Sequence, residues 1–316
     1  MEYFLKKETR FGFGDALVEL GKQNDKLFVL GADTSTSVGL EKFSKLFPKR
    51  FINVGIAETN LVGIASGLAI AGFIPFIATY GIFASGRSWE GIRTNICYSN
   101  LNVKIGGSHS GITVGYDGAT HQALEEIAIM RCIPRMTVIC PCDYFETKKA
   151  VLESAELKGP VYIRYGRNNT PIITNKNSVF KIGKANILKN GKDVAIISCG
   201  IMVYESLVAA SILKKQNISA RVINIHTIKP IDEEVIIKAA NDCGAIVTAE
   251  EHQIYGGLGS AVSEIITRKT LSIPIEMIGI NDRFGESGSS DELLFKFKLK
   301  SKNIVEAVLL ALNRKL

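Results

Sequence analysis

Glu58 is the only charged residue in a stretch of apolar and small residues, FINVGIAETNLVGIASGLAIAGFIPFIATY, that runs from Phe51 to Tyr80. An ionised carboxylate in such surroundings is costly unless it is paired, so we expect Glu58 to have a specific hydrogen-bond partner. Such a carboxylate is a candidate for handling a proton. The alternative is an acid in the first turn of a helix, where the helix dipole favours it and water reaches it.

A glycine-rich stretch from Lys104 to Gln122, KIGGSHSGITVGYDGATHQ, carries two of the four histidines, His109 and His121. Glycine lets the backbone approach a ligand closely, and histidines on such a loop can face a cleft. Histidine can donate to a phosphate or exchange a proton near neutral pH, while Asp117 can accept hydrogen bonds from sugar hydroxyls. A metal site is the competing interpretation, and the lack of a third clustered His or Cys argues against it.

Strands and helices must position these residues, and the chain alternates the two patterns. Helix-like segments begin at Thr9 and Tyr144, and strand-like segments cover residues 27–31, 73–79, 137–140 and 161–165. The alternation predicts an α/β fold with a mostly parallel sheet and helices on both faces. Asp33 follows the first of these strands, at the end where open α/β sheets bind ligands, although a turn or cap explains the same residue.

Residues 168–193, rich in Asn, Lys and Gly, read as a linker into a second α/β unit. Four buried strands are expected there, at residues 194–199, 220–224, 245–249 and 274–279, with helices at 203–214 and 233–240. A chain of 316 residues exceeds one ordinary core, so we predict domains at residues 1–180 and 181–316. The glycines after Glu250-Glu251-His252 lack the lysine of a phosphate loop, and neither His226 nor His252 is assigned a catalytic role.

The composition, with 46% hydrophobic and 22% charged residues, is that of a globular α/β protein. The net charge of +7 comes from scattered lysines without a basic run among aromatics, so no nucleic-acid partner is expected. Phosphorylated small molecules fit this charge, and so does a lysine surface that is merely solvated.

The sequence predicts a cytoplasmic protein without a membrane span. Residues 61–78 form an uncharged run of membrane-spanning length, but Pro75 and the pair Gly67 and Gly72 favour a helix that ends near Gly72 before a strand. The N-terminus has no signal-peptide pattern. Six cysteines without C-x-x-C spacing predict reduced, buried thiols.

The segments NVGIAETN and SHSGITVGYDGATHQ, each in its expected order, resemble the pyrimidine-binding domain of the transketolase family of thiamine diphosphate enzymes. The resemblance extends over nearly the whole chain and includes a second domain of the family's C-terminal type. It implies that Glu58 hydrogen-bonds N1′ of the cofactor's aminopyrimidine ring and promotes its proton transfers. It also implies that Tyr80 and Phe83 stack on this ring near Asp33, with Trp89 as the candidate for a third aromatic.

The same resemblance implies a site for the phosphate of a sugar substrate. Arg10 and His109 are expected to contact this phosphate, and Ser37 is expected near it. A guanidinium offers a planar fork of donors that suits a phosphate. The family has a further phosphate arginine after the strand at 161–165, where Arg164 aligns best and Arg167 is the alternative.

Within the histidine loop, the resemblance assigns Asp117 to the C2 hydroxyl of a sugar and His121 to the donor's C1 and C2 oxygens. Deoxyxylulose phosphate synthase shares the DG-x-THQ element but usually lacks a histidine at the place of His109. The beta subunits of 2-oxo acid dehydrogenases share the glutamate segment and have a less similar loop. The loop therefore favours transketolase over both alternatives.

The chain lacks the Gly-Asp-Gly element and the later asparagine with which these enzymes bind the metal and the diphosphate. It corresponds in length to the C-terminal half of a transketolase. The resemblance therefore implies a split enzyme, in which a partner subunit holds Mg²⁺ and the diphosphate in an α2β2 assembly that transfers a two-carbon ketol unit between sugar phosphates. A degenerate binding module is the non-enzymatic alternative, and the joint retention of Glu58, His109, Asp117 and His121 argues against it.

Overall fold

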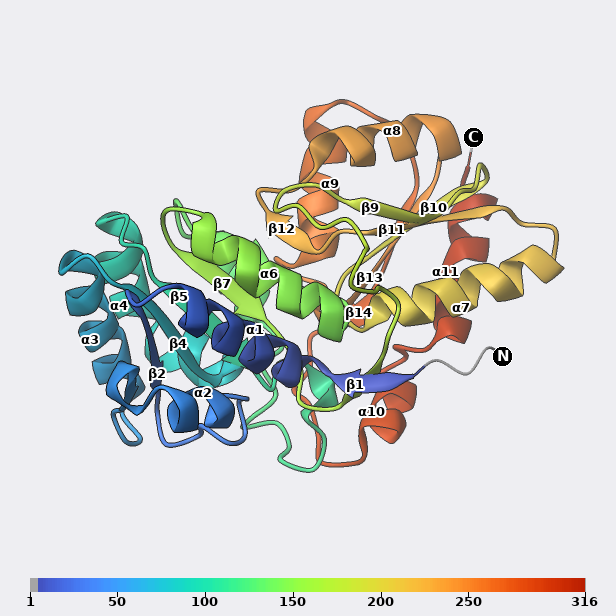
Figure 1. Ribbon diagram of the computed structural model, residues 1–316. Coiled ribbons are helices and arrows are strands. Elements are labelled where there is room, and N and C mark those ends of the chain that lie inside the picture. The colour runs from blue at the N-terminus through green and yellow to red at the C-terminus, as the bar shows by residue number, and fades with distance from the viewer. Residues whose placement is uncertain (1–4, 316) are drawn as a thin grey trace.

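Two α/β units lie side by side, each built around its own sheet (Figure 1). The computed structural model describes residues 5–315. A seven-stranded sheet belongs mainly to the N-terminal half, and a five-stranded sheet belongs to the C-terminal half. The predicted fold class, two α/β domains in succession, is confirmed.

The first sheet has the order β12-β6-β7-β5-β4-β2-β3, and every neighbouring pair except β12-β6 is parallel. Its strands are β2 (Leu27–Gly31), β3 (Phe51–Asn53), β4 (Ile74–Tyr80), β5 (Lys104–Ser108), β6 (Thr137–Ile139), β7 (Val161–Arg164) and β12 (Thr227–Lys229). Parallel strands covered on both faces are nearly continuous apolar runs, as in β4, IPFIATY. This property made the strands recognisable from the sequence.

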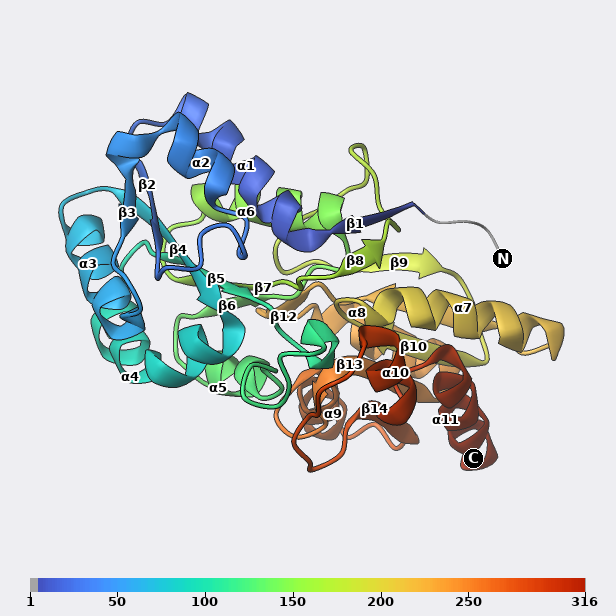
Figure 2. The same ribbon diagram turned by 90° about the horizontal axis from the view of Figure 1, so that it is seen from below.

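Helices cover both faces of this sheet (Figure 2). On one face α1 (Thr9–Gln23), α2 (Glu41–Leu46) and α6 (Tyr144–Glu156) form a core with strand residues such as Val29. On the other face α3 (Glu58–Ile70), α4 (Trp89–Gly91) and α5 (Glu126–Arg131) pack on residues such as Leu30. Successive strand residues point to opposite faces, which explains why neighbours in β2 belong to different cores.

Four short helical segments complete the connections: η1 (Pro48–Arg50) and η4 (Ile112–Val114) are 3₁₀-helical, whereas η2 (Phe83–Arg87) and η3 (Ile92–Tyr98) are π-helical. π-Helical turns are rare in proteins, and those that occur often lie at functional sites. Here η2 directly follows the end of β4, where the candidate cofactor residues lie.

The uncharged run at residues 61–78 is divided as expected. The helix α3 ends at Ile70, Gly72 has a left-handed φ of 88°, and β4 begins at Ile74. A residue with a Cβ is strained at that φ, so Gly72 suits the turn. Within residues 5–315, the helices are all too short or too polar to cross a membrane.

The second sheet has the order β14-β13-β10-β11-β9, and only β9 is antiparallel to its neighbour. Its strands are β9 (Asn186–Lys189), β10 (Val194–Ser198), β11 (Ala220–Asn224), β13 (Ile246–Gln253) and β14 (Ile275–Ile280). Its helices are α7 (Met202–Lys215), α8 (Glu233–Cys243), α9 (Leu258–Arg268), α10 (Ser290–Lys296) and α11 (Ser301–Asn313). The four predicted strands are present, whereas the half-exposed edge strand β9 lies in the expected linker.

The two units are joined more closely than a linker between separate domains suggests. The strand β12 leaves the second unit and pairs antiparallel with β6 of the first sheet. One hydrophobic core runs from Met136 and Val138 to Ile197 and Val262 of the second unit. The domain limits of 1–180 and 181–316 therefore stay a prediction.

All six cysteines are free, and five of them are buried. Cys132 is exposed just after α5, where its Sγ donates to the carbonyl oxygen of Ile129 at 3.2 Å. The prediction that all the thiols are buried is therefore wrong for Cys132, because the end of a short surface helix leaves that side chain in solvent.

Candidate active site

The loops that follow the parallel strands leave the first sheet at one edge. The pairing sets Gly31 beside Asn53 and Ala78, Tyr80 beside Ser108, and Gly107 beside Arg164. Because these pairs are parallel, the segments after β2, β3, β4, β5 and β7 emerge together, at the edge where open α/β sheets bind ligands. The segments that carry the predicted site residues thus start at neighbouring positions.

Glu58 is the first residue of α3 and is buried, with 4% of its surface exposed. Its partner is Arg87, whose Nη1 lies 3.3 Å from Oε2 of Glu58. Among residues 5–315, the other carboxylate oxygen, Oε1, has no hydrogen-bond partner. The expected partner thus exists, and sequence reasoning missed Arg87 although it is the first charged residue after Glu58.

Four rings gather near Arg87, the partner of this carboxylate. Tyr80 stacks on His109 with the ring centroids 4.0 Å apart and the planes 13° apart, and it also stacks on Phe83 at 5.9 Å. His121 meets Phe83 edge-on at 5.4 Å and Tyr80 edge-on at 5.9 Å. The guanidinium of Arg87 lies over Phe83, 4.6 Å from the ring centroid. The structure therefore brings together aromatic and histidine side chains that the sequence places up to 41 positions apart.

Trp89, the candidate for a third aromatic, is turned toward another part of the molecule. Its indole N–H donates to the carbonyl oxygen of Ile129 at 2.9 Å, and its ring packs against the core between the sheet and α3. In the described part of the chain, Trp89 makes no ring contact with Tyr80 or Phe83. Instead, His109 contacts Tyr80, and His121 contacts both Tyr80 and Phe83.

His109 is buried and has a left-handed φ of 53°. Burial, with the positive charges of Arg167 and Arg10 and the neighbouring His121, lowers the pKa of His109 to about 3. Its Nδ1 lies 2.8 Å from the hydroxyl oxygen of Ser108. A neutral imidazole has one N–H donor and one acceptor, so His109 can present a single donor or acceptor to a ligand near neutral pH.

The start of the chain is held against the segment after β7. The strands β1 (Lys6–Glu8) and β8 (Asn169–Pro171) pair antiparallel, and the hydroxyl of Thr9 donates to the carbonyl oxygen of Gly166 at 3.0 Å. Arg10 therefore lies near Arg167, consistent with the joint effect of their charges on His109.

Arg10 and Arg167 are both tethered to predicted substrate residues. Nη1 of Arg10 donates to the carbonyl oxygen of Ser37 at 2.9 Å. Nη1 of Arg167 donates to Oδ2 of Asp117, also at 2.9 Å, and the Arg167 side chain keeps 40% of its surface exposed. Arg10 with Ser37, and Arg167 with Asp117, thus form two pairs whose arginines are close enough to influence the charge of the buried His109.

Arg164 lies elsewhere, although it is only three residues from Arg167. Its side chain is 5% exposed, and Nε lies 2.5 Å from Oε1 of Glu126. Nη2 donates to the carbonyl oxygen of Glu251 at 2.7 Å, and Nη1 lies 3.8 Å from Sγ of Cys140. With these groups occupied inside the protein, Arg164 does not fit the phosphate contact expected of it. The alternative, Arg167, lies beside His109.

Asp33 is exposed at the end of β2 and also has a left-handed φ, of 61°. Its backbone N–H donates to Oδ1 of Asn53 at 2.9 Å, and Nδ2 of Asn53 donates back to Oδ1 of Asp33 at 3.3 Å. The two loops after β2 and β3 are therefore fixed to each other. Asn53, the first residue of the NVGIAETN segment, is a supporting residue that sequence reasoning missed.

This constellation suits the aminopyrimidine end of thiamine diphosphate. Glu58 combines a buried carboxylate with an acceptor oxygen that lacks a partner in the described chain, and its partner Arg87 lies over the ring of Phe83, which stacks on Tyr80. A heteroaromatic ring with a protonated nitrogen needs a stacking surface and an acceptor of this kind. Within residues 5–315, no three His, Cys, Asp or Glu side chains form a group that could hold a metal ion.

Comparison with known proteins agrees with this description. Residues 6–172 match the family model of the transketolase pyrimidine-binding domain, and residues 183–304 match that of the transketolase C-terminal domain. The fold and the site thus define a pyrimidine-binding domain followed by a transketolase-type C-terminal domain.

The chain belongs to the transketolase family. It is 49% identical over 305 residues to a putative transketolase C-terminal section from Methanocaldococcus jannaschii, covering 96% of both chains. It is 38% identical to human transketolase, covering 96% of this chain but 49% of that protein. It is similar in structure to a protein described as "Split gene transketolase, inactive beta4 tetramer", with a TM-score of 0.92, 47% identity and coverage of 98% and 99%. The resemblance inferred from the sequence is confirmed.

Proposed function

We propose that this chain is the C-terminal subunit of a split, thiamine diphosphate-dependent transketolase, and that the enzyme transfers a two-carbon ketol unit from a ketose phosphate to an aldose phosphate. The observation that carries the proposal is the buried Glu58, with one unpaired carboxylate oxygen, whose partner Arg87 lies over Phe83 in the stacked pair of Tyr80 and Phe83. When bound, thiamine diphosphate supplies the nucleophilic carbon that cleaves and reforms the bond between sugar carbons.

In this proposal Glu58 holds the proton on the aminopyrimidine nitrogen, and Tyr80 and Phe83 supply the surface on which that ring stacks. Arg87 now occupies Oε2 of Glu58 and lies over Phe83, so its guanidinium must share this space with the cofactor ring. The Arg87 side chain is 57% exposed and can turn into solvent, and the cofactor ring would then replace it as the partner of the buried Glu58. Asp33 lies near the ring on the neighbouring loop.

The substrate phosphate is held by Arg10, Arg167 and His109, with Ser37 beside them. Two guanidinium groups match the charge and geometry of a phosphate. The neutral His109 adds a single hydrogen bond without adding a third positive charge, because burial and both arginines lower the pKa of its imidazole. Arg167 replaces Arg164 in this role.

Asp117 and His121 would orient the sugar itself. Asp117 is an acceptor for a C2 hydroxyl, and its hydrogen bond to Arg167 ties it to the phosphate end of the site. His121 is on the loop and meets Phe83 and Tyr80 edge-on, so it can hold or transfer a proton at the C1 and C2 oxygens of a sugar bound there. These two residues link the sugar to the cofactor ring.

A partner subunit completes the site in this proposal. The chain spans about half of human transketolase, and the described residues offer contacts to the aminopyrimidine end of the cofactor. The diphosphate and Mg²⁺ would be bound by an N-terminal-type subunit in an α2β2 assembly. Closure by that subunit would exclude water from the reacting carbon. We place the enzyme in the cytoplasm and in pentose phosphate metabolism.

The experiment is a titration of this chain with the candidate partner, thiamine diphosphate and Mg²⁺, while transfer from xylulose 5-phosphate to ribose 5-phosphate is followed. We expect turnover to appear on mixing, to saturate at a one-to-one ratio, and to be negligible with this chain alone. Full turnover without a partner would refute the split-enzyme proposal.

One specific relative keeps a second activity open. The chain is also 39% identical, over 96% of its length, to a 1-deoxy-D-xylulose-5-phosphate synthase from Trichormus variabilis, whose length it covers by 48%. An assay with pyruvate as the donor in place of the ketose phosphate, and with glyceraldehyde 3-phosphate as the acceptor, distinguishes the synthase activity from the transketolase activity. Product from pyruvate, without transfer from xylulose 5-phosphate, would replace the transketolase proposal.

A further inference from the structure

The loop from Ser108 to Gln122 carries three of the predicted substrate residues, yet it packs on the second unit. Its Ile112 is fully buried in the hydrophobic core of that unit, together with Leu293 and Ile280. Leu124, just after the loop, belongs to the same core. The loop with the predicted substrate residues is therefore docked on the second unit, whose two histidines, His226 and His252, were assigned no catalytic role from the sequence.

Polar groups of the second unit fix the backbone of this loop at several points. The N–H of Thr113 donates to Oε1 of Glu251 at 2.7 Å, and its carbonyl oxygen accepts from the hydroxyl of Ser290 at 2.9 Å. The hydroxyl of Ser287 donates to the carbonyl oxygen of Tyr116 at 2.8 Å, one residue before Asp117. These bonds come from β13 and from the segment around the start of α10.

Gly111 shows how closely the loop approaches Glu251. Gly111 has a left-handed φ of 89°, and a Cβ at this position would lie 2.2 Å from the carboxyl carbon of Glu251. Glu251 is itself 2% exposed. The loop backbone between His109 and Thr113 therefore rests directly on a buried carboxylate of the other unit.

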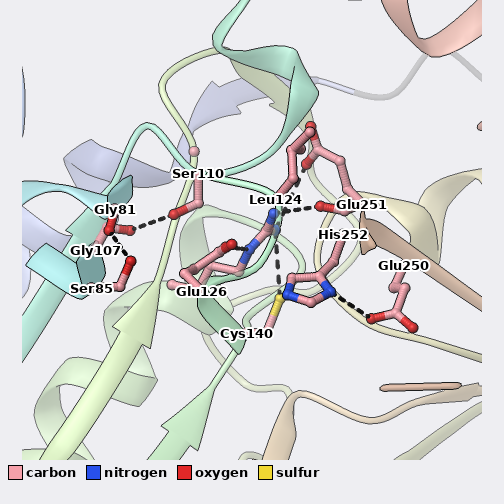
Figure 3. A network of polar contacts seen from close by, with 12 residues as sticks. Gly81, Ser85, Gly107, Ser110, Leu124, Glu126, Cys140, Glu250, Glu251 and His252 are labelled. Carbon is pink, nitrogen blue, oxygen red and sulfur yellow. Dashed lines mark hydrogen bonds and ion pairs between the residues drawn. The ribbon is translucent and has the colours of Figure 1, made fainter. Parts of the chain in front are cut away.

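Arg164 forms ion pairs with both Glu251 and Glu126. Figure 3 shows Glu126 and Glu251 in this network of polar contacts. Nη2 of Arg164 donates to the carbonyl oxygen of Glu251, and Nη1 lies 3.7 Å from its carboxylate. The row Glu126, Arg164, Glu251 and Thr113 thus runs from α5 through β7 and β13 into the loop. Each member is buried, so each bond is shielded from water.

We infer that Glu251 of the second unit is a positioning residue for the loop that carries His109, Asp117 and His121. It touches neither the cofactor residues nor the arginines at the phosphate, and it acts through the backbone of Thr113. The inference rests on the proposed function for its catalytic consequence. Its structural part, control of the loop by Glu251, stands on the contacts alone.

The test compares Glu251→Gln and Ser290→Ala with the control Glu264→Gln. A glutamine has one acceptor oxygen where the carboxylate has two, so it can serve Thr113 or Arg164 but not both. Ser290→Ala removes a donor to Thr113 without disturbing the buried ions, so it remains informative if Glu251→Gln fails to fold. Glu264→Gln breaks another ion pair between the units, with Arg131, and that pair lies away from the loop.

Hydrogen exchange of the isolated chain is the first measurement. We expect peptides covering residues 109–121 to exchange about ten- to a hundredfold faster in Glu251→Gln, because its single acceptor oxygen cannot satisfy both Thr113 and Arg164. We expect several-fold faster exchange in Ser290→Ala, because the loop loses a donor. Glu264→Gln should leave these peptides at the wild-type rate. Unchanged loop exchange in both loop variants, or an equal rise in the control, would overturn the inference.

The second measurement uses the assembled enzyme. Loop misplacement shifts His109, Asp117 and His121 together, so kcat should fall about tenfold or more through His121, and KM for the sugar phosphate should rise through His109 and Asp117. Wild-type kcat and KM in Glu251→Gln would contradict the positioning role. If wild-type enzyme shows no transfer at all, the proposed function fails, and the exchange measurement still decides the role of Glu251.

Discussion

Glu146 offers a test of how burial controls the stability of the junction between the two units. This first-turn residue of α6 is 2% exposed, and its carboxylate accepts from the backbone N–H of Cys142 at 2.6 Å and from Nδ2 of Asn224 at 2.7 Å. Both donors are neutral, so desolvation prevails over these bonds and raises the pKa of Glu146 from 4.5 to about 7.

The sign of the pH dependence follows from the raised pKa. Between pH 4.5 and 7 the folded protein keeps a proton on Glu146 that the unfolded chain has lost, so folding stability falls as the pH rises through this range. Each pH unit between the two pKa values lowers the free energy of unfolding by about 1.4 kcal/mol. The total loss of folding stability is about 3 kcal/mol and is complete above pH 7.

The perturbation is Glu146→Gln, which mimics the neutral acid. Oδ1 of Asn224 is buried without a partner, so rotation of that amide lets it accept a hydrogen bond from the glutamine. We therefore expect the variant to approach wild-type stability near pH 5 and to exceed it by about 3 kcal/mol at pH 8. Urea denaturation of both proteins across this range measures the difference, in which all other titrating groups cancel.

Glu264→Gln is the matched control. Hydrogen bonds from Arg131 lower the pKa of Glu264. The contribution of Glu264 to folding stability is therefore lost as the pH falls, whereas that of Glu146 is lost as the pH rises. Parallel stability curves for Glu146→Gln and wild type between pH 5 and 8 would refute the reasoning, because they would mean that the Glu146 carboxyl titrates alike in the folded and unfolded chain.

Two further predictions concern the candidate active site in the assembled enzyme. Glu58→Gln should lower kcat by about two to four decades and leave the melting temperature nearly unchanged, because the acid–base function is lost without a change in side-chain volume. Hydrogen exchange at C2 of the bound cofactor measures this step. A wild-type exchange rate in the variant would contradict the role of Glu58. Arg167→Gln should raise KM for phosphorylated sugars far more than for unphosphorylated ones. In contrast, Arg164→Gln should chiefly destabilise the fold, by about 3–5 kcal/mol, because it leaves the buried Glu126 and Glu251 without their cation. Steady-state kinetics with both substrate types and thermal melting of each variant separate these outcomes. A selective rise in KM in Arg164→Gln, with a destabilised fold in Arg167→Gln, would show that Arg164 binds the phosphate.

The sequence predicted the sheet of the first unit because its strands are buried on both faces. Runs such as IPFIATY and LFVLG carry that burial in their composition, and Gly72 and Pro75 separate helix from strand locally. The strand β12 could not be predicted in the same way. The segment Thr227–Lys229 is too short to show a period, and it joins a sheet whose other strands precede it by some 60 residues or more.

Glu58, Tyr80, Phe83, His109 and His121 could be selected from the sequence because each lies in a local segment of unusual composition. Parallel strands then place those segments at one edge without further information. Arg87 could not be assigned by that route, because its pairing with Glu58 depends on the π-helical path of η2 after β4.

The different surroundings of Arg164 and Arg167 show what only the tertiary structure decided. Arg164 is the last residue of β7, and its side chain is buried against Glu126 and Glu251. Arg167 lies beyond the strand end, where the chain is free to turn toward Asp117. Glu251 comes from β13 of the other unit. The direction of a side chain, and the partner it meets across 87 residues of sequence, are set by how two sheets pack and not by any local pattern.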